Sequence, residues 1–341
     1  MNDKNTRHEH FTSILKGKFA SDFPLKNLNW FKVGGKAQYF YSPYDSKELK
    51  GFLQNANNGL LKYLPIYIIG AGSNVLIRDK GIKGIVIKLN NFTGITLSKS
   101  FKATDTLEAD AFYLEVEAGT LNISVANFAY NNSIGGLEFL SGIPGTIGGG
   151  IAMNAGAFGR EYKDILVETK AIDYEGNHHT FKLRDLKLSY RDNGLLHEVN
   201  AEGPSTQVKK RNLIFTSALI KGYFKDSSLI LQEMSYIKKT REINQPSKVR
   251  TGGSTFANPE KGNLNKEYYT LKAWQLIDKA GLRGYSVGGA KISDLHCNFI
   301  INYNNATASD IEKLINKVIK TVKDKFQIVL TTEIKILGEL T

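Results

Sequence analysis

Apolar and polar positions alternate along the chain in short blocks, which predict helices and strands of ordinary length. The spacing of apolar residues predicts helices over residues 45–55, 121–130, 271–280 and 311–322. Compact apolar runs predict strands over residues 66–69, 85–89, 113–116, 165–172, 213–220, 298–302 and 326–337. Because these elements do not follow a regular strand–helix–strand rhythm, the pattern favours an α+β fold over a doubly wound sheet.

The C-terminal segment shows the clearest periodicity. The helix predicted over residues 311–322 has one apolar side, which is formed by Ile311, Leu314, Ile315, Val318 and Val322. Thr307 and Asp310 precede this helix at the spacing of a capping box. In the strand that follows, alternation places Glu333 on the less apolar face, which fits either a cleft or open solvent.

The 341 residues are enough for two or three domains, and we predict three stretches at residues 1–90, 91–221 and 222–341. No window approaches the roughly 18 apolar residues of a membrane helix, and the polar N-terminus lacks the apolar core of a signal peptide. The single cysteine, Cys297, rules out an internal disulfide and a cysteine-rich metal site. We therefore expect a cytoplasmic protein with no membrane association and no bound metal.

The formal net charge of +12 favours a nucleic acid or an anionic small molecule as partner, unless it reflects an ordinary lysine-rich surface. The basic runs at residues 209–211 and 238–241 are short and lie between apolar segments. The sequence contains no pattern typical of RNA-binding, zinc-finger or helix-turn-helix domains. We therefore expect no nucleic-acid partner, and the positive field suits a phosphorylated small molecule.

A glycine-rich loop follows the strand predicted over residues 66–69 and consists of Gly70, Ala71, Gly72, Ser73, Asn74 and Val75. It lacks the third glycine of a Rossmann fingerprint, and no clear amphipathic helix follows it. Glycines allow positive φ angles, so successive backbone N–H groups can point into one concavity and bind a diphosphate. A plain tight turn explains the same residues equally well at this stage.

A second glycine-rich run covers residues 135–159. Its apolar residues, such as Ile147 and Met153, indicate a packed segment rather than a flexible linker. Backbone packed against a large flat ligand would explain the glycines, and two such loops suggest a nucleotide cofactor extended between them. The residues assigned to this second part of the cofactor site are Gly142, Ile143, Pro144, Gly145, Thr146, Gly148, Gly149, Ala152, Asn154 and Gly156.

Several motifs occur together in one order along the chain. They are Trp-Phe-Lys-Val-Gly-Gly at 30–35, Gly-Ala-Gly-Ser-Asn-Val-Leu at 70–76, Gly-Ile-Pro-Gly-Thr-Ile-Gly-Gly at 142–149, Ser-Tyr-Arg at 189–191, Gly-Gly-Ser-Thr-Phe-Ala-Asn-Pro at 252–259, Gly-Gly-Ala at 288–290 and Thr-Glu-Ile-Lys at 332–335. Each motif alone is a modest signal, but the ordered set extends from about residue 25 to the C-terminal end. The chain thus resembles the UDP-N-acetylenolpyruvoylglucosamine reductase (MurB) family.

The resemblance implies a two-lobed FAD-binding region of the vanillyl-alcohol-oxidase (PCMH) type, in residues 1–90 and 91–221, and an α+β substrate-binding domain in residues 222–341. The first glycine-rich loop would hold the FAD diphosphate, and the second would line the flavin. NADPH would reduce the flavin and leave, and UDP-N-acetylglucosamine enolpyruvate would then enter the same cleft. The flavin N5 would deliver hydride to C3 of the enolpyruvyl group, and protonation of C2 would give UDP-N-acetylmuramate for peptidoglycan synthesis.

The resemblance also implies three catalytic residues, Ser254, Arg191 and Glu333. Hydride addition at C3 leaves enolate-like charge, so the site needs hydrogen-bond donors or positive charge there and a proton source at C2. Ser254 takes the position of the proton donor, although serine in a Gly-Ser turn is common. Arg191 suits the enolate because a guanidinium stays charged and binds a carboxylate bidentately. Glu333 would assist the enolate or the proton transfer.

Four further residues are candidates for substrate contact, namely Tyr190, Asn258, Arg283 and His296. Arg283 suits the UDP phosphates, whereas His296 fits a structural role equally well. The chain departs from the family pattern in the polar stretch 193–211 and at Ala257, which replaces a frequent lysine or arginine. The extra tyrosine loop of one branch of the family is not evident, so we expect the other branch, and we expect a monomer.

Two other functions fit parts of the pattern. A different FAD oxidoreductase, such as an oxygen-using alcohol or sugar oxidase, would also use the glycine-rich loops, because a fold does not fix a function. Its reduced flavin would react fast with oxygen and would not be reoxidised by the UDP-sugar. A basic binding protein would contain no flavin and would bind DNA or RNA in a salt-sensitive way. The motifs around Ser254 and Glu333 favour the reductase.

Overall fold

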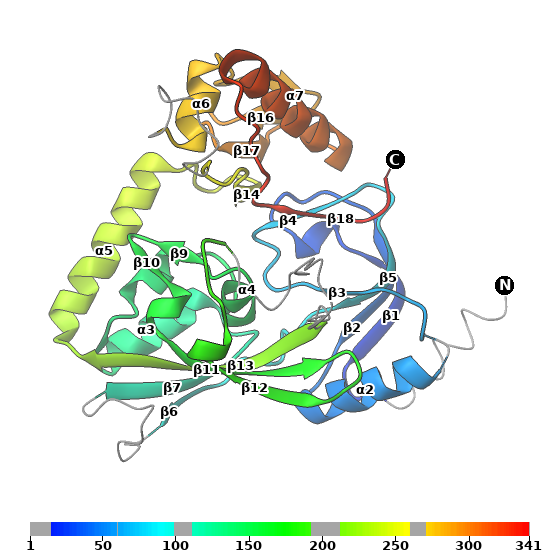
Figure 1. The fold of residues 1–341 in the computed structure, drawn as a ribbon, viewed down its shortest axis with the longest axis vertical. Coiled ribbons are helices and arrows are strands. Elements are labelled where there is room, and N and C mark those ends of the chain that lie inside the picture. The colour runs from blue at the N-terminus through cyan, green and yellow to red at the C-terminus, as the bar shows by residue number, and fades with distance from the viewer. Residues whose placement is uncertain (1–14, 60, 99–110, 192–211, 260–270, 341) are drawn as a thin grey trace, which may run out of the picture. The chain divides into compact units, whose positions relative to one another are not determined.

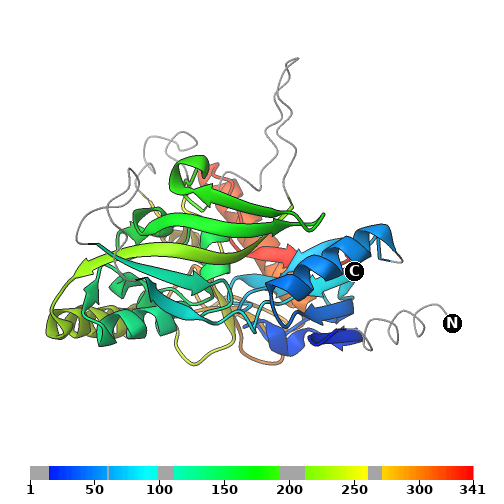
Figure 2. The same ribbon diagram turned by 90° about the horizontal axis from the view of Figure 1, so that it is seen from below.

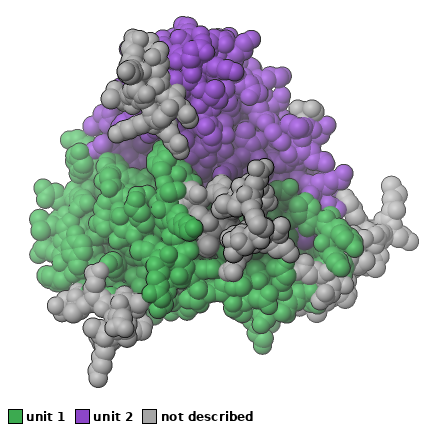
Figure 3. Space-filling view, in the orientation of Figure 1, with its two compact units in different colours: residues 1–20, 40–71, 86–239 green, residues 21–39, 72–85, 240–341 purple. Residues whose placement is uncertain are grey.

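The computed structural model describes residues 15–59, 61–98, 111–191, 212–259 and 271–340. The chain forms two compact units (Figure 3), of which unit 1 comprises residues 1–20, 40–71 and 86–239 and unit 2 comprises residues 21–39, 72–85 and 240–341. The N-terminal part of the chain is therefore shared between the units. The division into functional domains at residues 90 and 221 stays a prediction.

A four-stranded sheet near the N-terminus has the order β1-β2-β5-β3 (Figure 1), with strands Lys18–Pro24, Lys36–Ser42, Ile82–Ile87 and Ile66–Ile68. The chain passes between the two units within β1, β2 and β5. Helix α2 (Ser46–Asn58) begins after Asp45, whose carboxylate accepts a hydrogen bond from the Glu48 N–H at 2.7 Å. Such a cap contributes about 1 kcal/mol and explains why the helix starts there.

Unit 1 contains an antiparallel sheet with the order β12-β11-β13-β7-β6, whose long strands lie side by side with a marked twist (Figure 2). Its strands are His178–Lys182, Leu166–Asp173, Leu213–Phe224, Ala111–Glu117 and Ile95–Ser98 in that order, and β8 (Ile134–Gly135) pairs with the end of β13. Helix α3 (Asn122–Asn131) and the short helix α4 (Ile147–Ala152) share one buried apolar cluster with these strands. The cluster includes apolar residues of the second glycine-rich run, such as Ile147 and Ile151.

Short elements connect the larger ones in unit 1. They are the 3₁₀ turns Glu138–Gly142, Tyr162–Asp164 and Leu183–Asp185, and the hairpin of β9 (Gly156–Ala157) with β10 (Arg160–Glu161). Another 3₁₀ turn, Lys26–Leu28, lies in unit 2.

The apolar pattern does not predict helix α5 (Ser227–Asn244). Ile230 and Ile237 are buried along this helix, but Leu229, Tyr236 and Ile243 are exposed. Apolar residues on both faces blur the periodicity by which a helix is recognised, which explains the omission.

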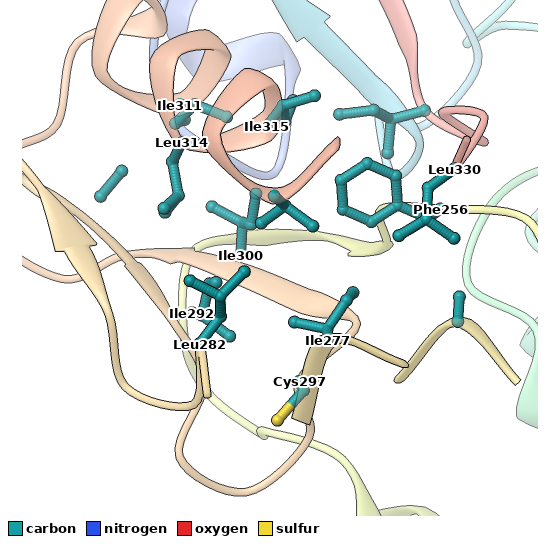
Figure 4. Packing of buried hydrophobic residues seen from close by; sticks show 14 of the residues in the cluster. Phe256, Ile277, Leu282, Ile292, Cys297, Ile300, Ile311, Leu314, Ile315 and Leu330 are labelled. Atoms are coloured by element: carbon teal, nitrogen blue, oxygen red, sulfur yellow. The ribbon is translucent and has the colours of Figure 1, made fainter. Parts of the chain in front are cut away.

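Unit 2 contains a second antiparallel sheet with the order β14-β17-β16-β15, formed by Thr251–Ser254, Phe299–Asn302, Ala290–Ile292 and Ser286–Val287. Its core also includes helices α6 (Ala273–Lys279) and α7 (Ala308–Phe326). Figure 4 shows Ile311, Leu314 and Ile315 of α7 beside Ile300 of β17. The predicted capping box is present, because Thr307 Oγ1 accepts from the Asp310 N–H and Asp310 Oδ2 accepts from the Thr307 N–H.

The prediction of a strand over residues 326–337 is wrong for most of its length. Helix α7 continues to Phe326, and only β18 (Lys335–Leu337) is a strand, which pairs in parallel with β4 (Val75–Ile77). The alternation arises because Ile328, Leu330 and Ile334 are buried in the unit 2 core while Val329 is exposed. No described helix combines the length and the apolar character needed to cross a lipid bilayer.

Candidate functional site

The first glycine-rich loop forms a turn between β3 and β4. Within the described part of the chain, the N–H groups of Gly70, Ala71 and Gly72 donate no hydrogen bond. Gly72 has a φ of 69°, and a Cβ there would lie 2.0 Å from the Leu28 carbonyl oxygen, so only glycine fits. The loop is therefore a tight turn and also has free N–H groups, which are able to bind an anion.

Lys88 lies beside this loop and was not identified from the sequence. Its Nζ donates to the Gly70 carbonyl oxygen at 2.5 Å, and burial lowers the pKa of Lys88 from its usual value. The available signal was a lysine that interrupts an otherwise apolar run, Ile85–Leu89. A lysine held at this point adds positive charge to a loop that is suited to bind a diphosphate.

The two glycine-rich loops meet in unit 1. A Cβ on Gly70 would lie 2.6 Å from the Thr146 hydroxyl, so the first loop approaches the residue before α4. Thr146 is the N-cap of α4, and its hydroxyl accepts from the Gly149 N–H at 3.4 Å. The structure thus brings together two segments that the sequence assigned to one cofactor.

Most glycines of the second run serve the packing of the chain itself. A Cβ would lie 2.3 Å from the Tyr162 ring at Gly150, 2.9 Å from Ala118 at Gly148 and 2.9 Å from Phe158 at Gly142. At Gly149 a Cβ would meet only the Thr146 hydroxyl, at 3.4 Å, and this residue is exposed. The open side of Gly149 is therefore a place where a flat ligand is able to lie against the backbone.

Other residues predicted to contact the cofactor have structural partners. Asn154 is 1% exposed, and its side chain binds Glu161, Lys163 and Ser189. Gly156 lies in the β9–β10 hairpin, where a Cβ would approach the Arg160 carbonyl oxygen to 2.7 Å. Pro144 and Gly145 are partly exposed ahead of α4, whereas Ile143 is buried.

In unit 2 the segment that holds Ser254 is connected to Glu333 and to the first loop. The Glu333 N–H donates to the Thr255 carbonyl oxygen at 2.8 Å. The Asn74 side-chain amide donates to the Glu333 carbonyl oxygen at 3.2 Å, and the Lys335 N–H donates to the Asn74 carbonyl oxygen at 3.0 Å. Three motifs that are far apart in the sequence thus share one hydrogen-bonded framework.

The backbone around Ser254 is held tightly. Gly253 has a φ of 79°, and a Cβ on Gly252 would lie 2.4 Å from the Phe31 ring, so both positions require glycine. The Thr255 N–H donates to the Asn298 carbonyl oxygen at 2.7 Å. The Thr255 hydroxyl is buried and has no hydrogen-bond partner in the described part of the chain. Ser254 itself is partly exposed.

His296 lies close to this segment, because its ring contacts Phe299, which is the cross-strand partner of Ser254. Its Nδ1 accepts from the Asn298 N–H at 3.2 Å, so the neutral ring carries its proton on Nε2. Burial lowers the pKa of His296 below its usual value and favours this neutral form. His296 is therefore a hydrogen-bond donor at neutral pH.

Asn258 and Arg283 already have partners in the chain. The Asn258 side-chain oxygen accepts from the Ala273 N–H at 3.1 Å, at the start of α6. The Arg283 guanidinium donates to both carboxylate oxygens of Asp278, at 2.9 and 2.7 Å, and to the Asp294 carbonyl oxygen, and the residue is exposed. These contacts constrain both side chains, and the contacts with substrate stay predictions.

Tyr190 and Arg191 lie at the end of a described segment of unit 1. The Arg191 guanidinium stacks over the Tyr190 ring at 5.2 Å from its centroid, and Arg191 has a left-handed φ of 59°. The stretch 193–211, in which the sequence departs from the family pattern, lies outside the described residues.

The residues of these loops fit FAD. The free N–H groups of residues 70–72, with Lys88 beside them, suit the diphosphate, and the open side of Gly149 suits the flavin ring. The carboxylates, histidines and cysteine of the described residues form no group of three or more that is suited to hold a metal ion.

Known proteins resemble the chain over nearly its whole length. Residues 37–182 match the FAD binding domain, and residues 245–337 match the C-terminal domain of UDP-N-acetylenolpyruvoylglucosamine reductase. The UDP-N-acetylenolpyruvoylglucosamine reductase of Rickettsia canadensis is 47% identical over 96% of this chain and 98% of its own length. That of Rickettsia bellii is 46% identical over 96% of each chain.

A solved structure supports the same relation. The crystal structure of the reductase (MurB) from Thermus caldophilus superimposes with a TM-score of 0.69 at 26% identity, covering 95% of this chain and 100% of that one. The predictions of an α+β fold, an FAD-binding region followed by a separate C-terminal domain, and an FAD-dependent oxidoreductase are confirmed. This chain belongs to the UDP-N-acetylenolpyruvoylglucosamine reductase family.

Proposed function

We propose that this chain reduces the enolpyruvyl ether of UDP-N-acetylglucosamine enolpyruvate to UDP-N-acetylmuramate, with FAD as cofactor and NADPH as reductant. The observation that carries the proposal is the framework of unit 2, in which the Glu333 N–H donates to the Thr255 carbonyl oxygen and the Glu333 carbonyl oxygen accepts from the Asn74 side-chain amide. The proposal is supported because this framework connects the segment of Ser254, the segment of Glu333 and the end of the first glycine-rich loop. FAD, when bound, supplies the hydride that is added to C3 of the enolpyruvyl group.

Ser254 is the proton donor to C2 in this proposal. Its backbone is held by the glycines on one side and by the Thr255–Asn298 hydrogen bond on the other, which fixes the point from which its side chain extends. A serine hydroxyl is a weak acid, and it therefore needs a neighbour that replaces its proton. We assign this task to Glu333, a carboxylate whose backbone N–H is hydrogen-bonded to Thr255, the residue after Ser254.

Arg191 binds the substrate carboxylate and stabilises the negative charge that develops after hydride addition. A guanidinium offers two parallel N–H donors and stays charged at every working pH. Its stacking on the Tyr190 ring restricts the side chain, which lowers the entropy cost of binding. Tyr190 is 54% exposed, so its hydroxyl remains available to the substrate.

The UDP-sugar is bound by the C-terminal domain, residues 222–341, and FAD by the lobes 1–90 and 91–221. Arg283 contacts a phosphate through the N–H hydrogens that Asp278 and the Asp294 carbonyl oxygen leave free, since the residue is exposed. Asn258 and neutral His296 supply hydrogen bonds to the sugar nucleotide. We further propose that the protein acts as a cytoplasmic monomer, binds no nucleic acid, and belongs to the branch without the extra tyrosine loop.

The test is anaerobic NADPH consumption by the purified protein, with and without UDP-N-acetylglucosamine enolpyruvate. Consumption beyond one equivalent of bound flavin that depends on the UDP-sugar supports the proposal. A single stoichiometric reduction that stalls with the UDP-sugar present contradicts the proposed substrate, and fast reoxidation by oxygen points to an oxidase.

The role of Ser254 has its own test. Ser254→Ala should bind FAD and be reduced by NADPH at the wild-type rate, because the hydroxyl acts only on the second substrate. Reoxidation by the UDP-sugar should fall by at least about 100-fold, the usual contribution of general acid catalysis. Ser124→Ala, a change at an exposed serine of α3, is the matched control. Normal turnover by Ser254→Ala would show that another group protonates C2.

A further inference from the structure

Asn154 is enclosed by polar partners within unit 1. Its side-chain Nδ2 donates to Glu161 Oε2 at 2.6 Å and to the Ser189 carbonyl oxygen at 2.9 Å. Its Oδ1 accepts from the Lys163 N–H at 3.0 Å. The residue is 1% exposed, so these three contacts account for both donor hydrogens and one acceptor site of the amide. The hydrogen bonds of the Asn154 side chain thus all go to other residues of the protein.

The contact with Ser189 acts on the segment that carries Arg191. Ser189 is followed directly by Tyr190 and Arg191, and the φ of 59° at Arg191 is uncommon for a residue with a side chain. A backbone conformation of this kind persists only where neighbouring contacts hold it. The hydrogen bond from Asn154 holds the peptide just before this turn, at a point where Ser189 is otherwise exposed.

Glu161 sets the direction of the Asn154 amide. An ionised carboxylate is only an acceptor, so the Nδ2 side of the amide must face Glu161, and the second hydrogen then points to Ser189. The other oxygen of Glu161 pairs with the Lys163 ammonium group, which keeps the carboxylate in place. Asn154 has a φ of 42°, a conformation that asparagine tolerates better than most residues.

We propose that Asn154, oriented by Glu161, is a positioning residue that holds the Ser189–Arg191 turn and thereby aims Arg191 at the carboxylate of the substrate. This inference rests on the role of Arg191 in the proposed function. It assigns to Asn154 a much larger effect on the reaction with the UDP-sugar than on the reaction with NADPH. A merely structural asparagine would change both reactions together, through loss of folded protein or of bound FAD.

The test uses Asn154→Asp in the FAD-loaded protein. The aspartate has the same shape and still accepts from the Lys163 N–H, but when ionised it donates to neither Glu161 nor Ser189. Stopped-flow measurements should show that flavin reduction by NADPH changes far less than reoxidation, because the hydrogen bonds of the Asn154 side chain all go to the protein itself. Reoxidation by UDP-N-acetylglucosamine enolpyruvate should slow by on the order of 10- to 100-fold, which is the size expected when a reacting group is misplaced by about 1 Å. Equal slowing of both reactions would overturn the proposal.

A compensating variant separates stability from positioning. In Asn154→Asp/Glu161→Gln the glutamine amide donates to the new carboxylate, so the contact between positions 154 and 161 returns with its direction reversed. The contact with the Ser189 carbonyl oxygen does not return. We expect the thermal midpoint to recover while reoxidation by the UDP-sugar stays slow. Recovery of both would show that Asn154 acts through the stability of the fold alone.

A double-mutant cycle with Arg191→Ala distinguishes failure of this inference from failure of the proposed function. If Arg191→Ala reoxidises at the wild-type rate, the proposed role of Arg191 is wrong, and the inference falls with it. If Arg191→Ala is slow, Asn154→Asp should add little in the Arg191→Ala background, because both changes remove the same interaction. Multiplicative effects would overturn the positioning role and leave the proposed function intact. Should Asn154→Asp not fold, Asn154→Gly, which tolerates the positive φ, takes its place in each arm.

Discussion

Gly149 and Gly150 are neighbours in α4, but Gly150 is closely packed and Gly149 has open space beside it. Alanine substitutions at the two positions therefore distinguish a glycine needed for packing from a glycine that faces the cofactor. A Cβ on Gly150 would lie 2.3 Å from the Tyr162 ring. Tyr162 is fully buried, and its hydroxyl donates to Asn122 Oδ1 at 2.5 Å, so displacing the ring disturbs both the core and this hydrogen bond. A Cβ on Gly149 would meet only the Thr146 hydroxyl, at 3.4 Å.

These distances give different expected stabilities. Overpacking at Gly150→Ala should cost about 1–3 kcal/mol, which the better helix propensity of alanine offsets by about 0.5–1 kcal/mol. A net loss of about 1 kcal/mol lowers the thermal midpoint by roughly 2–4 °C in a domain of 150–250 residues. Gly149→Ala gains the propensity without a clash, so the flavin-free protein should be at least as stable as the wild type.

For FAD binding by the folded protein, we expect Gly149→Ala to be the more damaging of the two substitutions. If Gly149 lies against the flavin, the added methyl group of Gly149→Ala should weaken FAD binding by at least tenfold, about 1.4 kcal/mol, without loss of fold. The assay is titration of flavin-free protein with FAD, followed by flavin fluorescence, beside thermal unfolding of the same samples. Wild-type affinity in a stable Gly149→Ala protein would refute the reasoning that this open face serves the cofactor.

Three other substitutions test single features of the fold. Thr307→Ala removes half of the capping box with Asp310 and should lower the free energy of unfolding by about 1 kcal/mol in urea denaturation; an unchanged midpoint would contradict this. Burial lowers the pKa of His296, so the unfolded chain takes up this proton first as the pH falls below about 6.5, and stability falls from there until the folded pKa is passed. His296→Gln should remove that part of the acid loss in a profile of thermal midpoint against pH, and a profile parallel to the wild type would disprove the assignment. Glu138→Gln weakens the contact of a buried carboxylate with Lys225, 2.8 Å away, and should cost about 1–3 kcal/mol in the same urea assay, whereas no loss would show that the pair is neutral to stability.

Much of the fold follows from local pattern. The capping box at Thr307 and the apolar stripe of α7 depend on residues within a few turns of each other, and both were predicted correctly. The predicted strand after α7 was wrong because alternating burial also arises in an irregular segment, as at Ile328 and Leu330. Helix α5 was missed because its exposed apolar residues obscure the period.

The candidate site shows the same division between local and distant causes. The motifs around Ser254 and Glu333 were visible in the sequence, but their connection through the Thr255 carbonyl oxygen was not. Lys88 was overlooked, since a lysine in an apolar run gives no hint that a loop carbonyl 18 residues away will accept its hydrogen bond. The contacts of Asn154 likewise depend on residues seven and 35 positions further along the chain.

The sequence alone determined the family, the FAD-dependent chemistry and the α+β class, because these depend on ordered motifs and on local periodicity. Only the tertiary structure decided which glycines are required by packing within the protein and which face a ligand. Gly72 and Gly150 are needed because Leu28 and Tyr162 approach them, whereas Gly149 has open space. The close approach of other residues to a glycine is set by packing between segments that are distant in the sequence. A run of glycines in the sequence therefore does not show which residues lie beside each of them.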